Sequence, residues 1–241
     1  MQNPTLQELD LLEYQLEQQL LLLEGRETYA GFIHASDPSF IWNWHHQVIC
    51  EKLDQVLSGE ITRLIITAPP RHGKSETTTR KFPAYVLGKQ PDWKVMVAAY
   101  GDSLARKFSR ATQKIMKSGR YAEIFPESHL VRRSSFTGVQ TRLTNRDFEL
   151  PNSKGQYLCG GIMSGLTGEG ADLLLIDDPL KNRKQAESAT YRERLWEEYT
   201  SVLRTRVQPG GRIVIITTRW HEDDLVGRLL LADQDPTNKN P

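Results

Sequence analysis

The chain has 241 residues, a formal net charge of +1, 38% hydrophobic and 25% charged residues, which is typical of a globular chain with an ordinary core. It contains no apolar run long enough for a bilayer and no basic-then-apolar leader, so we expect neither membrane insertion nor export. Cys50 and Cys159 form no CxxC pair, which favours a reducing compartment and argues against a zinc site. The near-neutral charge does not by itself indicate a nucleic-acid binder.

The first predicted element is a helix, and residues 1–28 are assigned to an N-terminal amphipathic helical arm. Thr5 and Glu8 have the spacing of a capping box. Leucines then recur at spacings of three and four, which places them on one face, and Gly25 is the expected stop. This stripe consists of Leu9, Leu12, Leu16, Leu20 and Leu23. Five acids and no base precede Gly25, and the helix either packs on the domain or forms a docking arm for a partner.

From residue 30 onward, short apolar runs alternate with helical patterns. Strands are expected at residues 63–68, 94–100, 173–176 and 212–217, with shorter strand-like segments over 128–160. Helices are expected at residues 45–57, 75–88, 102–118, 186–206 and 222–232, and the fourth aligns Leu195, Tyr199 and Val202. Strands that are apolar on both faces and alternate with helices predict an α/β fold with a mainly parallel central sheet and helices on both faces.

The helix over residues 102–118 combines an apolar face with a basic one. Leu104, Phe108, Ala111 and Ile115 share one face of it. Residues 102–120 carry six bases against Asp102, and residues 130–146 carry four arginines and no acid. Such basic segments are either solvated faces or contacts for an anionic partner.

A phosphate-binding loop is predicted between the first strand and the next helix. Residues 68–75 read APPRHGKS, a P-loop pattern in which Ala68 replaces the first glycine. In this pattern backbone N–H groups surround phosphate oxygens, and Gly73 allows the close approach. Lys74 would lie between the β- and γ-phosphates, and the Ser75 hydroxyl would reach Mg²⁺. The sequence therefore predicts a nucleoside triphosphate site.

Other residues of this loop are expected to contact ATP. Pro70, His72 and Glu76 flank the glycine and lysine and are assigned to the ATP-binding set. Within this set, His72 is expected to complete the loop and not to act as a catalyst. Arg71 adds a cation beside the γ-phosphate and is a candidate catalytic residue. Prolines stiffen the loop where the first glycine is missing.

Two further strands end in polar residues. Asp177 and Asp178 follow the strand at residues 173–176, and a buried strand ending in paired carboxylates is costly unless a cation or a reaction uses them. We assign Asp177 to Mg²⁺ and Asp178 to the general base that polarises the attacking water. Thr217 and Thr218 end the last strand, where a hydroxyl can sense the γ-phosphate and couple its state to a neighbouring element.

Four segments together resemble the large terminase subunit of tailed bacteriophages, the ATPase that drives DNA into capsids. They are APPRHGKS (68–75), LLLIDDP (173–179), ESATYRERLWEEY (187–199) and IITTRWHEDDLVG (215–227). The resemblance covers roughly residues 40–232. It implies an additional-strand, RecA-like P-loop NTPase domain over residues 29–232, with residues 233–241 starting a linker to a C-terminal nuclease domain. Nuclease activity is not expected from this chain.

The resemblance also implies site residues and partners. The P-loop of this family tolerates a missing first glycine and carries an arginine where Arg71 stands. The coupling motif of the family matches Thr217 and Thr218. Its adenine-contacting glutamine matches Gln47. A trans-acting arginine would be Arg132, Arg133 or Arg142, with Arg133 ranked first. The implied cofactors and partners are ATP and Mg²⁺, double-stranded DNA, a portal protein, a small terminase subunit and a homo-oligomeric ring, commonly of five. The expected location is the host bacterial cytoplasm, transiently at the procapsid portal, with no membrane.

Three functions remain open at this point. The first is an ATPase motor domain that translocates double-stranded DNA into a procapsid. The second is a helicase-like DNA translocase of the same superfamily, and the third is a nucleotide-gated assembly module with little turnover. A GTPase switch is disfavoured because the chain has no Asn-Lys-x-Asp run.

Overall fold

The computed structural model describes residues 5–130, 142–166 and 168–234. Within these ranges a six-stranded sheet has the order β1-β6-β5-β2-β4-β3. Its strands are β1 (Arg63–Thr67), β2 (Lys94–Ala99), β3 (Asp147–Glu149), β4 (Gln156–Gly161), β5 (Ala171–Asp177) and β6 (Val207–Thr217). All neighbouring pairs are parallel except β3 with β4. The predicted α/β fold with a mainly parallel sheet is confirmed.

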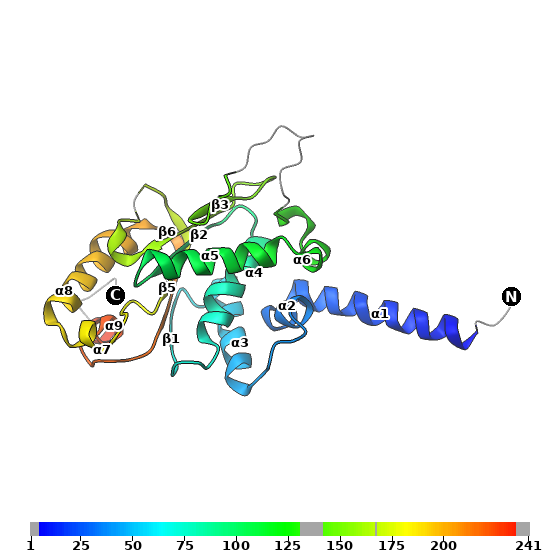
Figure 1. Cartoon of the computed structure of the whole chain (residues 1–241), viewed down its shortest axis with the longest axis horizontal. Helices are drawn as coiled ribbons and strands as arrows, with labels where there is room; N and C mark the ends of the chain where they lie inside the picture. Colours follow the sequence, from blue (N-terminus) through cyan, green and yellow to red (C-terminus); the bar gives the residue numbers. More distant parts are fainter. Residues whose placement is uncertain (1–4, 131–141, 167, 235–241) are drawn as a thin grey trace.

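Helices surround this sheet (Figure 1). The α-helices are α1 (Leu6–Glu27), α2 (Tyr29–Ser36), α3 (Trp44–Ser58), α4 (Phe82–Lys89), α5 (Asp102–Met116), α6 (Gly119–Ile124), α7 (Arg183–Glu187), α8 (Ala189–Glu198) and α9 (Leu225–Gln234). Two π-helical segments, η1 (Glu76–Lys81) and η4 (Tyr199–Leu203), continue into α4 and out of α8, and η2 (Pro126–Ser128), η3 (Ile162–Ser164) and η5 (Arg204–Arg206) are short 3₁₀ turns. Within the described ranges, no helix has the length and apolar character needed to span a membrane.

The sheet buries both of its faces, as the apolar strands require. Val95 and Val97 of β2 face a core shared with α2 to α6, whereas Met96 and Ala98 face a second core with α8, η4 and α9. This division follows from the strand itself, because successive side chains point to opposite faces. The two cores fix the sheet from both sides and hold the ends of β1, β5 and β6 in register.

The helix α1 begins at the predicted capping box and extends away from the rest of the molecule (Figure 1). The Thr5 hydroxyl accepts from the Glu8 N–H, and the Glu8 carboxylate accepts from the Thr5 N–H. The prediction that Gly25 ends the helix is wrong, because α1 continues to Glu27. Gly25 is buried instead, and a Cβ there would lie 3.1 Å from the Ala35 Cβ. The glycine therefore permits close packing of α1 on α2.

Most of the α1 leucine stripe is solvent-exposed. Leu9, Leu12, Leu16, Leu20 and Leu23 are each about half exposed, at 46% to 59%. At the root of the helix the Arg26 guanidinium donates to the Ile124 carbonyl at 2.8 Å. In α2 the Tyr29 hydroxyl donates to the Thr77 carbonyl, and the Tyr29 N–H donates to Asp54 at 3.1 Å. The arm is thus anchored at its base and free of intramolecular packing along much of its length.

We expect Gly31→Ala to destabilise the junction between α1 and α2. A Cβ at residue 31 would lie 2.3 Å from the Glu24 carbonyl oxygen, which already accepts from the Thr28 N–H. Overpacking against backbone should lower the free energy of unfolding by about 2 kcal/mol. Chemical denaturation measures this change. Gly119→Ala is the matched control, since its Cβ would meet nothing within 4 Å, and equal unfolding midpoints for the two variants would contradict the packing argument.

The predicted helix over residues 186–206 is wrong in detail. The expected helix over residues 186–206 breaks at Ser188, whose hydroxyl accepts from the Tyr191 N–H and caps α8. The π-helical segment η4 then shifts the side-chain register, because a wider turn adds a residue. As a result Leu203 is fully buried in place of the predicted Val202, which is half-buried.

The buried face of α5 is wider than the predicted apolar row, of which Leu104 and Ile115 pack against the core. Phe108 is buried as expected, but Leu104, Ala111 and Ile115 are half-buried. The buried residues are instead Ala105, Phe108, Ser109, Thr112, Gln113 and Met116. Polar members of this face have backbone partners, as when the Gln113 amide donates to the Thr144 carbonyl at 2.6 Å. The sequence prediction used apolar residues alone and so left out the polar members of the face.

Candidate functional site

The carboxyl ends of three parallel strands form one edge of the sheet. Thr67 of β1 pairs with Thr217 of β6, and Asp177 of β5 pairs with Ile216. Residues that follow these strands therefore lie close together, at the edge where open α/β sheets bind ligands. The three predicted polar motifs, far apart in the chain, converge here.

The loop over residues 68–73 joins β1 to a helix that begins at Lys74. Its first residue is tied to β6, since the Ala68 N–H donates to the Thr217 carbonyl at 3.3 Å. Arg71 and Gly73 both have a positive φ, of 64° and 73°. The first amides of a helix have no intrahelical acceptor, and their dipoles favour an anion. The loop thus presents the electropositive start of a helix beside the polar strand ends.

Lys74 lies beneath this loop and is 6% exposed. Its ammonium is 3.0 Å from Oδ2 of Asp178, across a sequence separation of 104 residues. Asp178 has a positive φ of 42°, an uncommon backbone conformation for a residue with a side chain. Its other oxygen, Oδ1, accepts from the Thr218 N–H at 3.0 Å. One carboxylate therefore links the buried lysine to the end of β6.

Asp177 is fully buried and holds two hydroxyl groups. The Ser75 Oγ donates to Oδ1 at 3.0 Å, and the Thr79 Oγ1 donates to Oδ2. Burial raises the pKa of Asp177 to about 6, although the Thr79 hydrogen bond acts in the opposite direction. A buried carboxylate of this kind is stabilised in its charged form by a nearby cation.

Thr217 and Thr218 join the end of β6 to the loop. The Thr218 hydroxyl donates to the Ala68 carbonyl at 3.3 Å, and its N–H donates to Asp178. The Thr217 hydroxyl donates to the Thr218 carbonyl at 3.2 Å. Thr218 consequently contacts both the loop start and the acid that pairs with Lys74.

The donor set fits a magnesium ion that takes most of its ligands from a nucleotide and water. Ser75 and Asp177 offer a hydroxyl and a carboxylate oxygen 3.0 Å apart, which are the hard oxygen ligands that Mg²⁺ prefers. The described ranges contain no group of three His, Cys, Asp or Glu side chains that could hold a metal without such a ligand.

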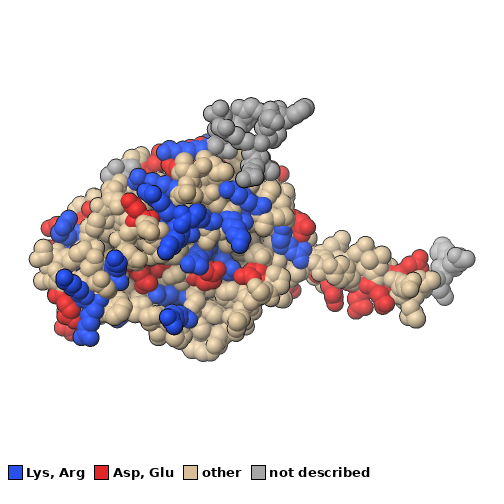
Figure 2. Space-filling model, in the orientation of Figure 1, with Lys and Arg blue, Asp and Glu red and all other residues tan. Residues whose placement is uncertain are grey.

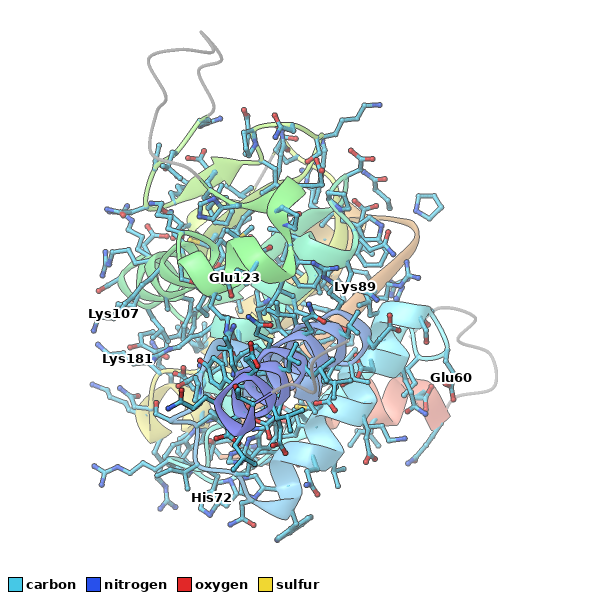
Figure 3. All side chains as sticks on the ribbon, turned by 90° about the vertical axis from the view of Figure 1, so that its right-hand side faces the viewer. Glu60, His72, Lys89, Lys107, Glu123 and Lys181 are labelled. Carbon is cyan, nitrogen blue, oxygen red and sulfur yellow. The ribbon has the colours of Figure 1, made fainter. Side chains whose placement is uncertain are left out.

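The remaining predicted residues are distributed around the loop. Pro70, Arg71 and His72 are exposed, and Figure 3 shows His72 at the end of the molecule where α3 lies. Glu76 is paired with Arg80 at 2.8 Å and with Lys81 at 3.2 Å.

Among the described residues, Gln47 and Arg142 make no hydrogen bond or ion pair with the loop. Gln47 is exposed on α3 and lines neither of the two pockets beside the loop. Arg142 is an exposed residue paired with Asp147, whereas Arg132 and Arg133 lie outside the described residues.

Sequence reasoning missed two parts of this site. Thr79 lies four residues after Ser75, and that helical spacing could have placed both hydroxyls on one face. A cavity of about 530 Å³ also lies beside Gly73 and Glu76, lined by the segment from residue 37 to 46. The aromatic residues of this segment were visible in the sequence, but nothing in the pattern placed them at the loop.

The fold and the site together define a class. The strand β6 lies between the loop-bearing strand β1 and the acidic strand β5, which makes this α/β domain an additional-strand, RecA-like P-loop domain. The family model "Terminase large subunit, T4likevirus-type, N-terminal" matches residues 65–238. The chain belongs to this family of large terminase subunits.

A solved structure has the same fold. The large terminase of bacteriophage HK97 superimposes with a TM-score of 0.55 at 12% sequence identity. The match covers 88% of this chain and 42% of the HK97 chain, so the chain spans less than half of that protein's length. No curated protein matches the chain.

Proposed function

We propose that this chain is the ATPase motor domain of a viral terminase, which hydrolyses ATP to translocate double-stranded DNA into a procapsid. The observation that carries the proposal is the meeting of Lys74, Ser75, Asp177 and Asp178 at one edge of the sheet. Membership of the large terminase family favours DNA packaging over helicase work.

In this proposal the loop binds the triphosphate of ATP. The amides at the start of the helix face the phosphates, and Lys74 exchanges its carboxylate partner for the β- and γ-oxygens. Ser75 and Asp177 would hold Mg²⁺, which neutralises charge on the phosphates when bound. Asp177 is fully buried, and the low local dielectric strengthens the attraction between its carboxylate and a bound cation.

Asp178 is proposed as the general base for the attacking water. Asp178 forms an ion pair with Lys74. This ion pair breaks when the lysine turns to the phosphates. The freed Oδ2 can then accept a proton from water, while Oδ1 stays on the Thr218 N–H. Since Thr218 also contacts Ala68, we propose that Thr217 and Thr218 couple the state of the γ-phosphate to the loop.

The nucleotide base is assigned to the cavity beside Gly73. Its walls include Phe40, Trp42 and Asn43, so it offers aromatic surfaces and a polar edge. Gln47, the adenine contact implied by the resemblance, does not line this cavity and stays a prediction. Arg133 remains the proposed trans-acting arginine of a neighbouring subunit. A ring of about five copies, a portal protein and a small terminase subunit are proposed partners, in the host cytoplasm.

The proposed domain organisation has three parts. Residues 1–28 form the arm, residues 29–232 form the ATPase domain, and residues 233–241 begin a linker.

Steady-state phosphate release with magnesium tests the function, and we expect slow hydrolysis by the isolated chain. ATP binding without any phosphate release would contradict the ATPase proposal and favour a nucleotide-gated assembly module.

A basic surface on α5 is the proposed contact for the DNA backbone. Arg106, Lys107, Arg110 and Lys114 are exposed and follow helical spacing along one face. Figure 2 shows Lys and Arg side chains gathered over this helix, and Figure 3 shows Lys107 pointing outward from the edge of the molecule. Asp102, the single acid of α5, is engaged by the Gly161 N–H at 2.7 Å. Such a surface would bind phosphates without sequence preference.

We expect Lys107→Glu combined with Arg110→Glu to weaken binding of double-stranded DNA by about 10-fold or more at low salt. Loss of two phosphate contacts should also reduce the slope of log K against log salt by about two. Fluorescence anisotropy with a labelled duplex measures both quantities. The control is Lys184→Glu with Arg194→Glu, an equal charge change at exposed positions of α7 and α8, and an equal loss in both pairs would show a net-charge effect and no local contact.

A further inference from the structure

Two histidines of α3 contact the same backbone carbonyl in the loop. His46 Nε2 lies 3.2 Å from the His72 carbonyl oxygen, and His45 Nε2 lies 3.0 Å from it. The residue after this carbonyl is Gly73, where the loop turns into the helix that carries Lys74 and Ser75. The contact therefore falls at the peptide that precedes the proposed phosphate-binding amides.

A second hydrogen bond fixes the protonation of the His46 ring. The Asn43 N–H donates to His46 Nδ1 at 3.1 Å, as part of the capping box of α3. Because Nδ1 accepts, it carries no proton, and the neutral ring must carry its proton on Nε2. His46 thus donates from Nε2 to the His72 carbonyl. Burial and the neighbouring His45 lower the pKa of His46, which favours this neutral form.

The His46 ring also fills the space beneath Gly73. A Cβ at residue 73 would lie 2.5 Å from His46 Nε2. The ring is 7% exposed and packs against Phe40 and Trp42, with centroid distances of 5.0 Å and 6.4 Å. Its position is therefore set by the α3 cap on one side and by aromatic packing on the other, and it acts as a rigid support.

The geometry points to His46 as a positioning residue for the phosphate loop. In a trans peptide the C=O and the following N–H point in opposite directions, and the structure has no cis peptide among its described residues. A donor that holds the His72 carbonyl toward α3 therefore turns the Gly73 N–H away from α3 and into the loop. This inference rests on the proposed function, because the oriented amide serves phosphate binding.

His45 provides a second donor to the same oxygen. A carbonyl has two lone pairs and can accept both bonds, so the loss of one histidine can be masked by the other. The two differ in burial, since His46 is buried and His45 is half-buried. A test of His46 therefore starts from His45→Ala, which leaves His46 as the described side-chain donor to this carbonyl.

Asparagine and glutamine separate the two hydrogen bonds of His46. Counted in bonds from Cα, the Asn amide reaches the position of Nδ1 and the Gln amide reaches the position of Nε2. In the His45→Ala background, His46→Asn keeps an acceptor for the Asn43 N–H but loses the donor to the His72 carbonyl. His46→Gln keeps that donor and loses the acceptor.

Isothermal titration with ATP and magnesium tests the inference. The ATP affinity of His45→Ala is the reference, and we expect the added His46→Asn to weaken that affinity by about fivefold, the loss of roughly one hydrogen bond. His46→Gln in the same background should bind ATP within twofold of His45→Ala, while thermal melting shows that all three variants are folded.

Two results would overturn the assignment. One is that the His46→Asn variant binds ATP as tightly as its His45→Ala parent. The other is that His46→Asn and His46→Gln weaken ATP affinity equally, which would mean that His46 has a purely structural role. Failure of the proposed function has a different signature, because the wild type would then bind no ATP, or Lys74→Ala would bind it equally well.

Discussion

Lys74→Ala should remove magnesium-dependent ATP hydrolysis, with a loss of about 100-fold or more in steady-state phosphate release. The lysine is buried beneath the loop, 3.0 Å from Asp178. No other described side chain places an ammonium at this position, so its removal leaves the transferred phosphoryl charge without its fixed cation. Phosphate release at saturating ATP measures the loss.

The control for this variant is Lys154→Ala, which removes an exposed lysine from a surface loop. It should hydrolyse ATP at the wild-type rate. If Lys74→Ala releases phosphate as fast as the wild type, the assignment of the loop to phosphate binding fails. A folded state of Lys74→Ala, checked by thermal melting, ensures that a lost rate reports the site and not the fold.

Asp178→Asn should leave ATP binding nearly intact and reduce turnover by about 100-fold or more, the usual contribution of a general base. Asparagine suits the site, because it tolerates the positive φ of 42° and its carbonyl can still accept from the Thr218 N–H. The change also removes the ion pair with Lys74, so ATP no longer competes with a carboxylate for the lysine. Affinity should therefore stay equal or increase.

Equilibrium binding and phosphate release measured on the same preparation separate these effects. Asp233→Asn, at an exposed position of α9, is the matched control and should change neither quantity. Loss of ATP binding in Asp178→Asn would assign Asp178 a structural role. Unchanged turnover would move the general base to another residue and leave Asp178 as a partner of Lys74.

The sequence was sufficient to predict how the main parts of the site meet. Lys74 with Ser75, Asp177 with Asp178, and Thr217 with Thr218 each follow an apolar strand, and parallel strands bring their carboxyl ends to one edge. That rule needs no knowledge of strand order. The interposed position of β6 came from the family resemblance and could not be read from the strands themselves.

The parts that escaped prediction depend on local departures from regular structure. The periodicity rule assumes a constant number of residues per turn. It could not anticipate the π-helical segment, which brings Leu203 into the core and leaves Val202 half-buried. It also ended α1 at Gly25, because a glycine that stops a helix and one that permits close packing look the same in one sequence. The contact of His46 with the loop depends on the entry angle of α3, which tertiary packing sets.

The anchoring of α1 has a mechanical consequence. A helix of 22 residues is about 33 Å long at 1.5 Å per residue, comparable to the width of a small domain. A load applied near Leu9 would act on the α1–α2 junction through this long lever. Tyr29, the first residue of α2, would carry part of that torque to the Thr77 carbonyl, two residues beyond Ser75. A pull on the arm would thus be delivered as strain beside Ser75, the proposed magnesium ligand.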